Sequence, residues 1–243
     1  MVLRAVAAAN LRRLGENAYP GRGLVLGLSA DGSRLVQVYW LTGRSPASRN
    51  RVLLQEGESV KAESLDPSQV PNPDLVIYHP VRRVGSWHVV SNGDQTDTLA
   101  AALARGERWQ DALATREYEP DAPHWTPRIS GLHDAADPRH GYALSILKAE
   151  EGDGPSCVRQ HFLYERGCPG IGHCLTTYAG DGHPLPSFAG EPWPVPLPGS
   201  AREMAQQYWE LLPPERRVAL LVKTVEFGTG ATQLEIVNRH GWA

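Results

Sequence analysis

The stretch of the chain that most constrains its fold is residues 21–43, GRGLVLGLSADGSRLVQVYWLTG. Two runs rich in β-favouring residues flank a polar tetrapeptide at residues 30–33, and the Asp31-Gly32 pair inside it is a strong turn signal. We therefore predict a β-hairpin. Further strand-like runs lie at residues 51–55, 75–81 and 84–91, so the first third of the chain is expected to consist mainly of strands.

Helix-favouring segments follow these strands. Residues 96–104 are predicted to form a helix that Thr96 or Asp97 caps and Gly106 ends, and residues 108–119 a second helix that stops at Pro120. Strand character returns at residues 142–149, 156–166 and 173–180, and a helix at residues 200–215 precedes strands at 217–227 and 232–238. This order of elements predicts an α+β protein with layered sheets.

The 243 residues are predicted to form one domain over residues 1–243. Residues 1–18 are expected to be a helical N-terminal extension, with Leu3, Val6, Leu11 and Leu14 on one face. Residues 183–199 contain six prolines, which predict a long surface loop without regular structure. An interdomain linker is the alternative, but too little chain follows this segment to build a separate core.

The formal net charge of −3 argues against a nucleic-acid-binding protein, because such proteins usually carry a surplus of basic residues. No apolar run is long enough to span a bilayer, and Arg4, Arg12 and Arg13 interrupt the segment where a secretory signal needs an apolar core. We therefore expect a cytoplasmic protein with neither nucleic-acid nor membrane partners. The three cysteines lack CxxC spacing, so neither a disulfide framework nor a zinc site is predicted.

The first polar cluster is GRSPASRNR at residues 43–51, which contains Arg44, Arg49 and Arg51 and no acidic residue. Arginine suits phosphate oxygens because its guanidinium group donates paired hydrogen bonds in a fixed geometry and keeps its charge. The serines and the asparagine of the cluster supply further donors. The alternative interpretation is a solvated surface loop.

Two other polar clusters also have two interpretations each. SNGDQTDT at residues 91–98 can be a turn and helix cap, or one wall of a pocket for a ligand with amide and carbonyl edges. EYEPDAPHWTPRIS at residues 117–130 combines carboxylates with an arginine, which can be a surface ion pair or acid–base machinery for an anionic substrate. The sequence contains no G-x-S-x-G, P-loop or H-E-x-x-H motif, so covalent catalysis and metal-dependent hydrolysis lack local support.

Five blocks occur along the chain in one order: YPGRG (19–23), GRSPASRNR (43–51), IYHPVR (77–82), SNGDQTDT (91–98) and YEPDAPHWTPRI (118–129). Together they resemble the archaeal-type IMP cyclohydrolase family, which closes the purine ring in the last step of inosinate synthesis. The resemblance runs from about Tyr19 to Ile129. It implies a four-layer αββα sandwich similar to that of the N-terminal-nucleophile hydrolases, without their self-processing nucleophile.

The resemblance also implies a reaction, the cyclisation of 5-formamidoimidazole-4-carboxamide ribonucleotide (FAICAR) to IMP with loss of water. No cofactor and no metal ion is expected, the partner is a small purine nucleotide, and a homo-oligomer is compatible with the family. Two alternatives stay open. One is a non-catalytic regulatory protein that binds purine nucleotides, and the other is a cyclohydrolase for a related nucleotide.

Candidate site residues are carried over from the matching blocks. Glu119 is expected to act as general base or proton shuttle, and Tyr78 to donate to the developing oxyanion, with Arg51 as the third catalytic residue. Asn92 and Asp94 are expected to orient the carboxamide. The other implied substrate-binding residues are Arg22, Arg44, Ser45, Arg49, Gly93, Thr96, Asp97 and Arg128, and the arginine that holds the phosphate is left open.

Overall fold

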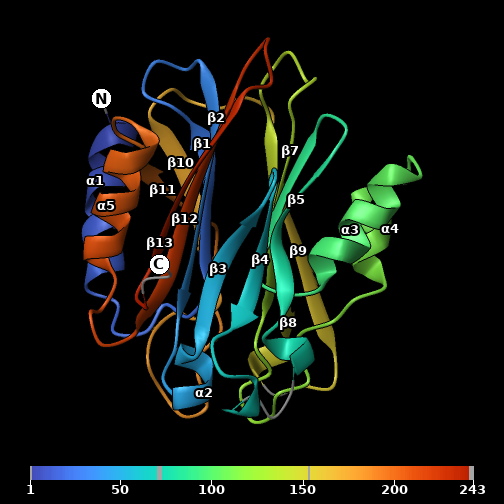
Figure 1. Cartoon of the computed structure of the whole chain (residues 1–243), viewed down its shortest axis with the longest axis vertical. Coiled ribbons are helices and arrows are strands. Elements are labelled where there is room, and N and C mark those ends of the chain that lie inside the picture. Colours follow the sequence, from blue (N-terminus) through green and yellow to red (C-terminus); the bar gives the residue numbers. More distant parts are fainter. Residues whose placement is uncertain (1, 70–72, 153, 241–243) are drawn as a thin grey trace.

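The computed structural model describes residues 2–69, 73–152 and 154–240, whose strands form two antiparallel sheets (Figure 1). The six-stranded sheet has the order β11-β10-β1-β2-β12-β13, and the seven-stranded sheet runs in sequence order from β3 to β9. The strands of the first sheet are β1 (Gly23–Leu28), β2 (Arg34–Thr42), β10 (Ile171–Thr176), β11 (Trp193–Pro196), β12 (Arg217–Glu226) and β13 (Thr232–Asn238). Those of the second are β3 (Arg51–Glu56), β4 (Ser59–Ser64), β5 (Tyr78–Val84), β6 (Trp87–Ser91), β7 (Arg128–Asp134), β8 (Tyr142–Ala149) and β9 (Cys157–Tyr164).

The helices lie on the outer faces of the two sheets (Figure 1). Helices α1 (Val2–Gly15) and α5 (Ala201–Leu211) cover the six-stranded sheet, whereas α3 (Gln95–Ala104) and α4 (Trp109–Ala114) cover the seven-stranded sheet. A short helix, α2 (Pro46–Arg49), joins β2 to β3, and single 3₁₀ turns lie at Pro67–Gln69, Pro73–Leu75 and Glu150–Gly152. Within the described ranges, no helix is long and apolar enough to cross a membrane. The predicted α+β class with layered sheets is confirmed.

Strand β2 shows why two cores form. Side chains alternate between the two faces of a strand, so Tyr39 and Leu41 point toward the seven-stranded sheet, while Val38 and Trp40 point toward α1 and α5. All four are fully buried. A third core lies where α3 and α4 pack on the outer face of the seven-stranded sheet. The core between the sheets contains the most buried side chains of the three.

The predicted hairpin is confirmed. Strands β1 and β2 pair from Gly23↔Trp40 to Leu28↔Leu35, and the turn lies at residues 29–33. The Asp31 carboxylate accepts hydrogen bonds from both Ser29 Oγ (2.6 Å) and the Ser33 backbone N–H (3.0 Å). Gly32 has a positive φ of 72°, which glycine adopts without steric cost.

Helix α1 buries a different face from the predicted one. Ala7 and Leu14 are buried and Leu11 packs partly against the same core, but Leu3 and Val6 are exposed. Positions 7, 11 and 14 form one stripe at helical spacing, and this stripe faces the sheet. The helix of the predicted extension thus exists over Val2–Gly15 with a rotated apolar face, and residue 1 lies outside the described residues.

Several predicted boundaries were wrong. Helix α3 begins with Asp94 at its N-cap position, not with Thr96 or Asp97, and no side chain caps it. Helix α4 ends at Ala114 instead of continuing to residue 119, and β5 begins at Tyr78 because Pro73–Leu75 forms a 3₁₀ turn. The predicted end of α3 is confirmed, since Gly106 follows its C-cap with a positive φ.

The proline-rich segment at residues 183–199 is not entirely a loop, which corrects the prediction. Its residues Trp193–Pro196 form strand β11, which pairs with β10 from Cys174↔Trp193 to Ile171↔Pro196. β11 lies at the edge of its sheet. An edge strand needs ladder hydrogen bonds on one side only, so it tolerates the missing N–H of proline.

Candidate active site

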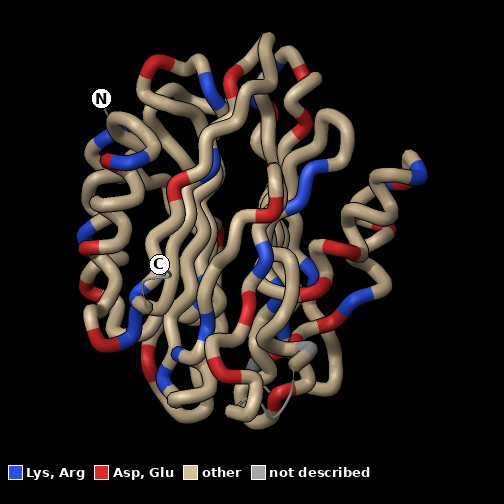
Figure 2. The backbone as a smooth tube through the Cα atoms, in the orientation of Figure 1, with Lys and Arg blue, Asp and Glu red and all other residues tan. Residues whose placement is uncertain are grey.

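The candidate residues gather at one end of the two sheets, the lower end in Figure 1. Arg22 directly precedes β1, Tyr78 begins β5, Asn92 directly follows β6 and Arg128 begins β7. Neighbouring strands are antiparallel, so the end of one strand lies beside the start of the next. The pair Ser91↔Ser130 places the end of β6 next to the start of β7. Both blue and red segments occur along this end in Figure 2, so basic and acidic residues are both present there.

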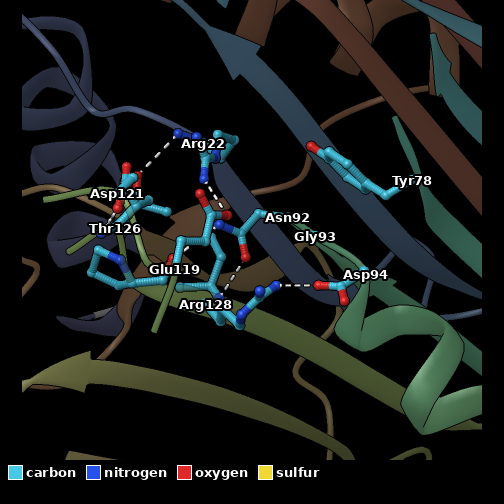
Figure 3. A network of polar contacts seen from close by, with 12 residues as sticks. Arg22, Tyr78, Asn92, Gly93, Asp94, Glu119, Asp121, Thr126 and Arg128 are labelled. Carbon is cyan, nitrogen blue, oxygen red and sulfur yellow. Dashed lines mark hydrogen bonds and ion pairs between the residues drawn. The ribbon is translucent and has the colours of Figure 1, made fainter. Parts of the chain in front are cut away.

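The centre of the site is an ion pair between Arg22 and Glu119 (Figure 3). Arg22 Nη2 lies 2.5 Å from Glu119 Oε1, and the two side chains are only 13% and 4% exposed. The backbone N–H of Glu119 donates to the Thr126 carbonyl at 2.8 Å, which holds the loop before β7 in place. Glu119, which the sequence placed at the end of a predicted helix, thus lies beyond α4 as a buried carboxylate whose side chain and backbone are both held.

Burial changes the acidity of both partners. Burial raises the pKa of the Glu119 carboxyl above its ordinary value, and the nearby Asp121 adds to this, against the opposing effect of Arg22. Burial by itself would lower the pKa of Arg22, but the Glu119 charge holds that pKa well above its ordinary value. Arg22 therefore stays charged while Glu119 is a carboxylate that takes up a proton more readily than usual.

Arg128 belongs to a second charged group beside this pair. Its Nη1 lies 2.5 Å from Asp94 Oδ1 and 2.9 Å from Gln95 Oε1, and Arg116 contacts the other oxygen of Asp94. The pKa of Asp94 is lowered because hydrogen bonds and charge from the two arginines outweigh the effect of burial. The two arginines also line a surface hollow of about 390 Å³. Asp94 therefore orients guanidinium groups in this structure.

Gly93 lies where these two groups meet, and Figure 3 shows it between Asn92 and Asp94 at the start of α3. A Cβ atom at this position would lie 2.7 Å from Arg128 Nη1 and 2.7 Å from Gln95 Oε1. Such contacts are too short for carbon, so a side chain here would displace the polar groups. The absence of a side chain keeps the backbone close to the ion pairs.

Asn92 and Thr96 hold the backbone of the site together. The Asn92 amide donates to the Pro127 carbonyl at 2.9 Å, and its oxygen accepts from the Ile129 backbone N–H at 2.7 Å. The Thr96 hydroxyl donates to the Gly93 carbonyl at 2.9 Å. Both side chains are fully buried. Asp97 lies apart, on the exposed side of α3, where it pairs with Arg82 at 2.8 Å.

Tyr78 approaches the site from the seven-stranded sheet (Figure 3). It is 4% exposed, and its hydroxyl oxygen lies 2.6 Å from the hydroxyl oxygen of Tyr39 on the other sheet. The charge of Arg22 acts on both phenols. This brings Tyr78, Arg22 and Glu119 into one buried neighbourhood.

The arginine cluster at residues 43–51 is partly helical, because α2 occupies Pro46–Arg49. The Ser45 hydroxyl caps α2 by accepting a hydrogen bond from the Ser48 backbone N–H, and the Ser48 hydroxyl accepts one from the Ser45 backbone N–H. Ser45 is exposed and has a structural role in this capping box. The helix orders the segment between the arginines.

The three arginines of this cluster differ in their partners. Arg44 Nη1 pairs with Asp181 at 2.8 Å and its Nη2 contacts His124. Arg51 is 3% exposed, and its Nε donates to the Ser48 carbonyl at 2.9 Å. Among the described residues, no carboxylate lies within ion-pair distance of Arg49 or Arg51. Two guanidinium groups of this cluster therefore lack a protein counter-charge among the residues that the structure describes.

Several residues of the site escaped the sequence analysis. In the sequence, Tyr39 resembles any other residue of an alternating strand. Arg116 was assigned to a predicted helix, but α4 ends at Ala114, before this residue. Thr126 and Tyr178 are both buried and share a hydrogen bond of 2.5 Å, although they lie far apart in sequence. Only the charge of Arg116 could have drawn attention, because contacts between distant strands leave no local pattern. Over the described ranges, no group of three or more His, Cys, Asp and Glu side chains is arranged to hold a metal ion.

Comparison with known proteins gives the family. The family model for IMP cyclohydrolase-like proteins matches residues 19–230. Relatives named IMP cyclohydrolase include that of Methanopyrus kandleri, 32% identical over 146 residues that cover 56% of this chain and 72% of the relative. The relative from Methanothrix thermoacetophila is 32% identical over 146 residues (56% and 70%), and that from Methanocaldococcus jannaschii 30% over 144 residues (56% and 69%). The chain belongs to the IMP cyclohydrolase-like family.

The family match confirms the predicted family and corrects how much of the chain the resemblance covers. The sequence blocks placed the resemblance between about Tyr19 and Ile129, but the family match continues to residue 230. It therefore includes the proline-rich segment, α5 and β12, for which the blocks showed no counterpart. In this chain, β10, β11 and β12 complete the sheet that carries Tyr39 and that Arg22 directly precedes.

Proposed function

We propose that this protein is an IMP cyclohydrolase that closes FAICAR to IMP with loss of water. The observation that carries the proposal is the buried Glu119 carboxylate, paired with Arg22 and close to the Tyr78 phenol, in a chain that belongs to this family. Relatives from several archaea bear the name of this activity. The substrate is accordingly a small purine nucleotide.

The reaction forms one bond within a single molecule. The carboxamide nitrogen attacks the formyl carbon, and the carboxamide and formamide nitrogens each lose one proton. The formyl oxygen leaves as water that carries both protons. Holding nucleophile and electrophile in attack geometry can supply several kcal/mol of the barrier, roughly 7–11 kcal/mol in the best intramolecular cases. The remaining work for the protein is proton transfer and stabilisation of the oxyanion.

Glu119 is assigned the proton removal from nitrogen. General-base catalysis works best when the pKa of the base lies near the working pH, and burial shifts the pKa of Glu119 in that direction. Tyr78 is assigned the donation to the formyl oxygen. Arg22 Nε is buried and has no hydrogen-bond acceptor among the described residues, so it is a spare donor for the substrate at the same place.

The phosphate is assigned to Arg49 and Arg51. A dianionic phosphate needs cationic donors, and these two arginines lack a carboxylate partner in the described part of the chain. Arg22, Arg44 and Arg128 are already neutralised by Glu119, Asp181 and Asp94. Arg51 thus moves from the catalytic set to the phosphate-binding set in this proposal.

Four broader expectations accompany the function. We infer that the two sheets and their outer helices form the αββα sandwich of the N-terminal-nucleophile hydrolases, and that residues 1–243 are one domain. The cytoplasmic location and the homo-oligomer stay predictions. The shared core between the sheets supports the single domain, since its residues come from both sheets.

The direct test is to add FAICAR to the purified protein and to follow IMP formation by chromatography. We expect a rate that is proportional to protein concentration and far above the uncatalysed reaction. No rate above that background, together with IMP binding in calorimetry, would indicate a non-catalytic nucleotide-binding protein instead. Turnover of a different carboxamide nucleotide but not of FAICAR would assign the protein to a related substrate.

A further inference from the structure

Tyr39 is a fully buried phenol on β2, and it lies opposite Tyr78 across the core between the sheets. Its hydroxyl is 2.6 Å from that of Tyr78, and the described residues offer it no other hydrogen-bond partner. A buried hydroxyl proton without an acceptor is unfavourable. Either hydroxyl can donate in this pair, and when Tyr78 gives its proton to a substrate atom, Tyr39 is the donor to the Tyr78 oxygen.

This direction determines what Tyr78 can do. A phenol oxygen that accepts a hydrogen bond keeps its own proton free for another acceptor. Tyr78 is the member of the pair that begins β5, beside Arg22 at the candidate active site, whereas Tyr39 lies within the core. The proton of Tyr78 is thus available to a substrate atom, while that of Tyr39 is not.

Electrostatics support the same assignment. Burial raises the pKa of Tyr39 well above its ordinary value, and the contact with Tyr78 contributes, against opposing effects of Arg22 and Arg51. Tyr39 therefore keeps its proton. When Tyr78 gives up its proton, its phenolate faces the Tyr39 O–H at 2.6 Å and the nearby Arg22 charge, and a short charge-assisted hydrogen bond can form at this separation.

We propose that Tyr39 is a positioning residue, which fixes Tyr78 as the proton donor to the formyl oxygen and stabilises the phenolate that remains. This rests on the proposed function. In this step the O–H bond of Tyr78 breaks and an O–H bond forms on the formyl oxygen, and the phenolate later regains a proton that leaves a substrate nitrogen. The Tyr39 proton stays on Tyr39 throughout.

The test uses three variants, Tyr39→Phe, Tyr78→Phe and the double variant, in the whole protein. We expect Tyr39→Phe to lower kcat about 10-fold to 100-fold with little change in KM, because the donation to a charged oxygen is lost. We expect the double variant to be no slower than Tyr78→Phe, since Tyr39 acts only through Tyr78. Multiplied losses in the double variant would overturn the proposal.

The split between kcat and KM supplies a readout that a merely structural role would not produce. Without the Tyr39 O–H, the charge that forms on the Tyr78 oxygen during proton donation loses its hydrogen bond, whereas the bound substrate keeps its contacts. The loss in Tyr39→Phe is therefore expected in kcat and not in KM. A raised KM with wild-type kcat would overturn the proposal.

Tyr208→Phe is the matched control. Tyr208 is 1% exposed and its hydroxyl donates to the Pro196 carbonyl at 2.9 Å, on the opposite face of the same sheet. It should lose stability without losing kcat. If Tyr39→Phe behaves like this control, Tyr39 is structural. Wild-type protein that forms no IMP would instead refute the proposed function, and wild-type kcat in Tyr78→Phe would refute the role of Tyr78.

Discussion

Replacing Glu119 by Gln tests the centre of the site, because it removes the charge and keeps the shape of the side chain. Arg22 would lose its partner at 2.5 Å while remaining largely buried, with 13% of its side chain exposed. Leaving one charge of a buried pair uncompensated typically costs roughly 3–5 kcal/mol. The glutamine oxygen still accepts a hydrogen bond, and this reduces the expected loss to about 2–4 kcal/mol.

This free energy is large enough to measure. In a chain of this size, 1 kcal/mol shifts the melting temperature by roughly 2–4 °C, so a loss near 3 kcal/mol lowers it by roughly 6–12 °C. The same variant loses the proposed base, and positioned proton transfer usually contributes about 10²–10⁴-fold to the rate. We therefore expect a large fall in kcat at a temperature where the variant is still folded.

The matched control is Glu58→Gln at the opposite end of the sheets. Glu58 pairs with Arg83 at 2.6 Å, but the two side chains are 44% and 35% exposed, and exposed pairs contribute only about 0–1 kcal/mol. The assays are thermal unfolding by circular dichroism and IMP formation at saturating substrate. Wild-type kcat in Glu119→Gln would refute the base assignment. A melting temperature as little changed as that of the control would refute the energetic argument.

Four further predictions follow from the site and the core. In calorimetry, Arg49→Ala is expected to weaken IMP binding about 10-fold to 100-fold, because a charge-assisted hydrogen bond is worth roughly 1.5–3 kcal/mol. Arg44 already pairs with Asp181, so Arg44→Ala should weaken IMP binding less. A larger effect of Arg44→Ala than of Arg49→Ala would contradict the phosphate assignment. The acid limb of kcat should lie above the ordinary glutamate range, since burial raises the pKa of Glu119 and only the carboxylate is active; a limb at the ordinary value of about 4.3 would argue against this base. Turnover should survive EDTA, and loss that a divalent ion restores would overturn the metal-free mechanism. Burial lowers the pKa of His88 to about 3 and that of His133 to about 4. As the pH falls below about 6.5, the unfolded chain therefore binds more protons than the folded protein, and the free energy of unfolding decreases. Urea titrations at several pH values should show that the free energy of unfolding depends less steeply on pH in a His88→Asn variant, and an unchanged dependence would refute the linkage.

Local sequence rules explain much of the fold. The Asp31-Gly32 turn, the end of α3 at Gly106 and most strands were predictable, because turn geometry and side-chain alternation act over a few neighbouring residues. The rules failed where tertiary contacts compete with local preference. Strand β11 is an example, since an edge position lets a proline-rich segment pair with β10.

The candidate site divides in the same way. The sequence by itself determined which chemical groups are present: the carboxylate of Glu119, the phenol of Tyr78 and the arginines in the blocks that resemble one family. Only the tertiary structure decided their partners. Arg22 and Glu119 are 97 positions apart, and Tyr39 and Tyr78 lie on different sheets. The physical reason is that acidity and hydrogen-bond direction depend on burial and on the nearest charge, and both are set by the packing of distant strands against each other.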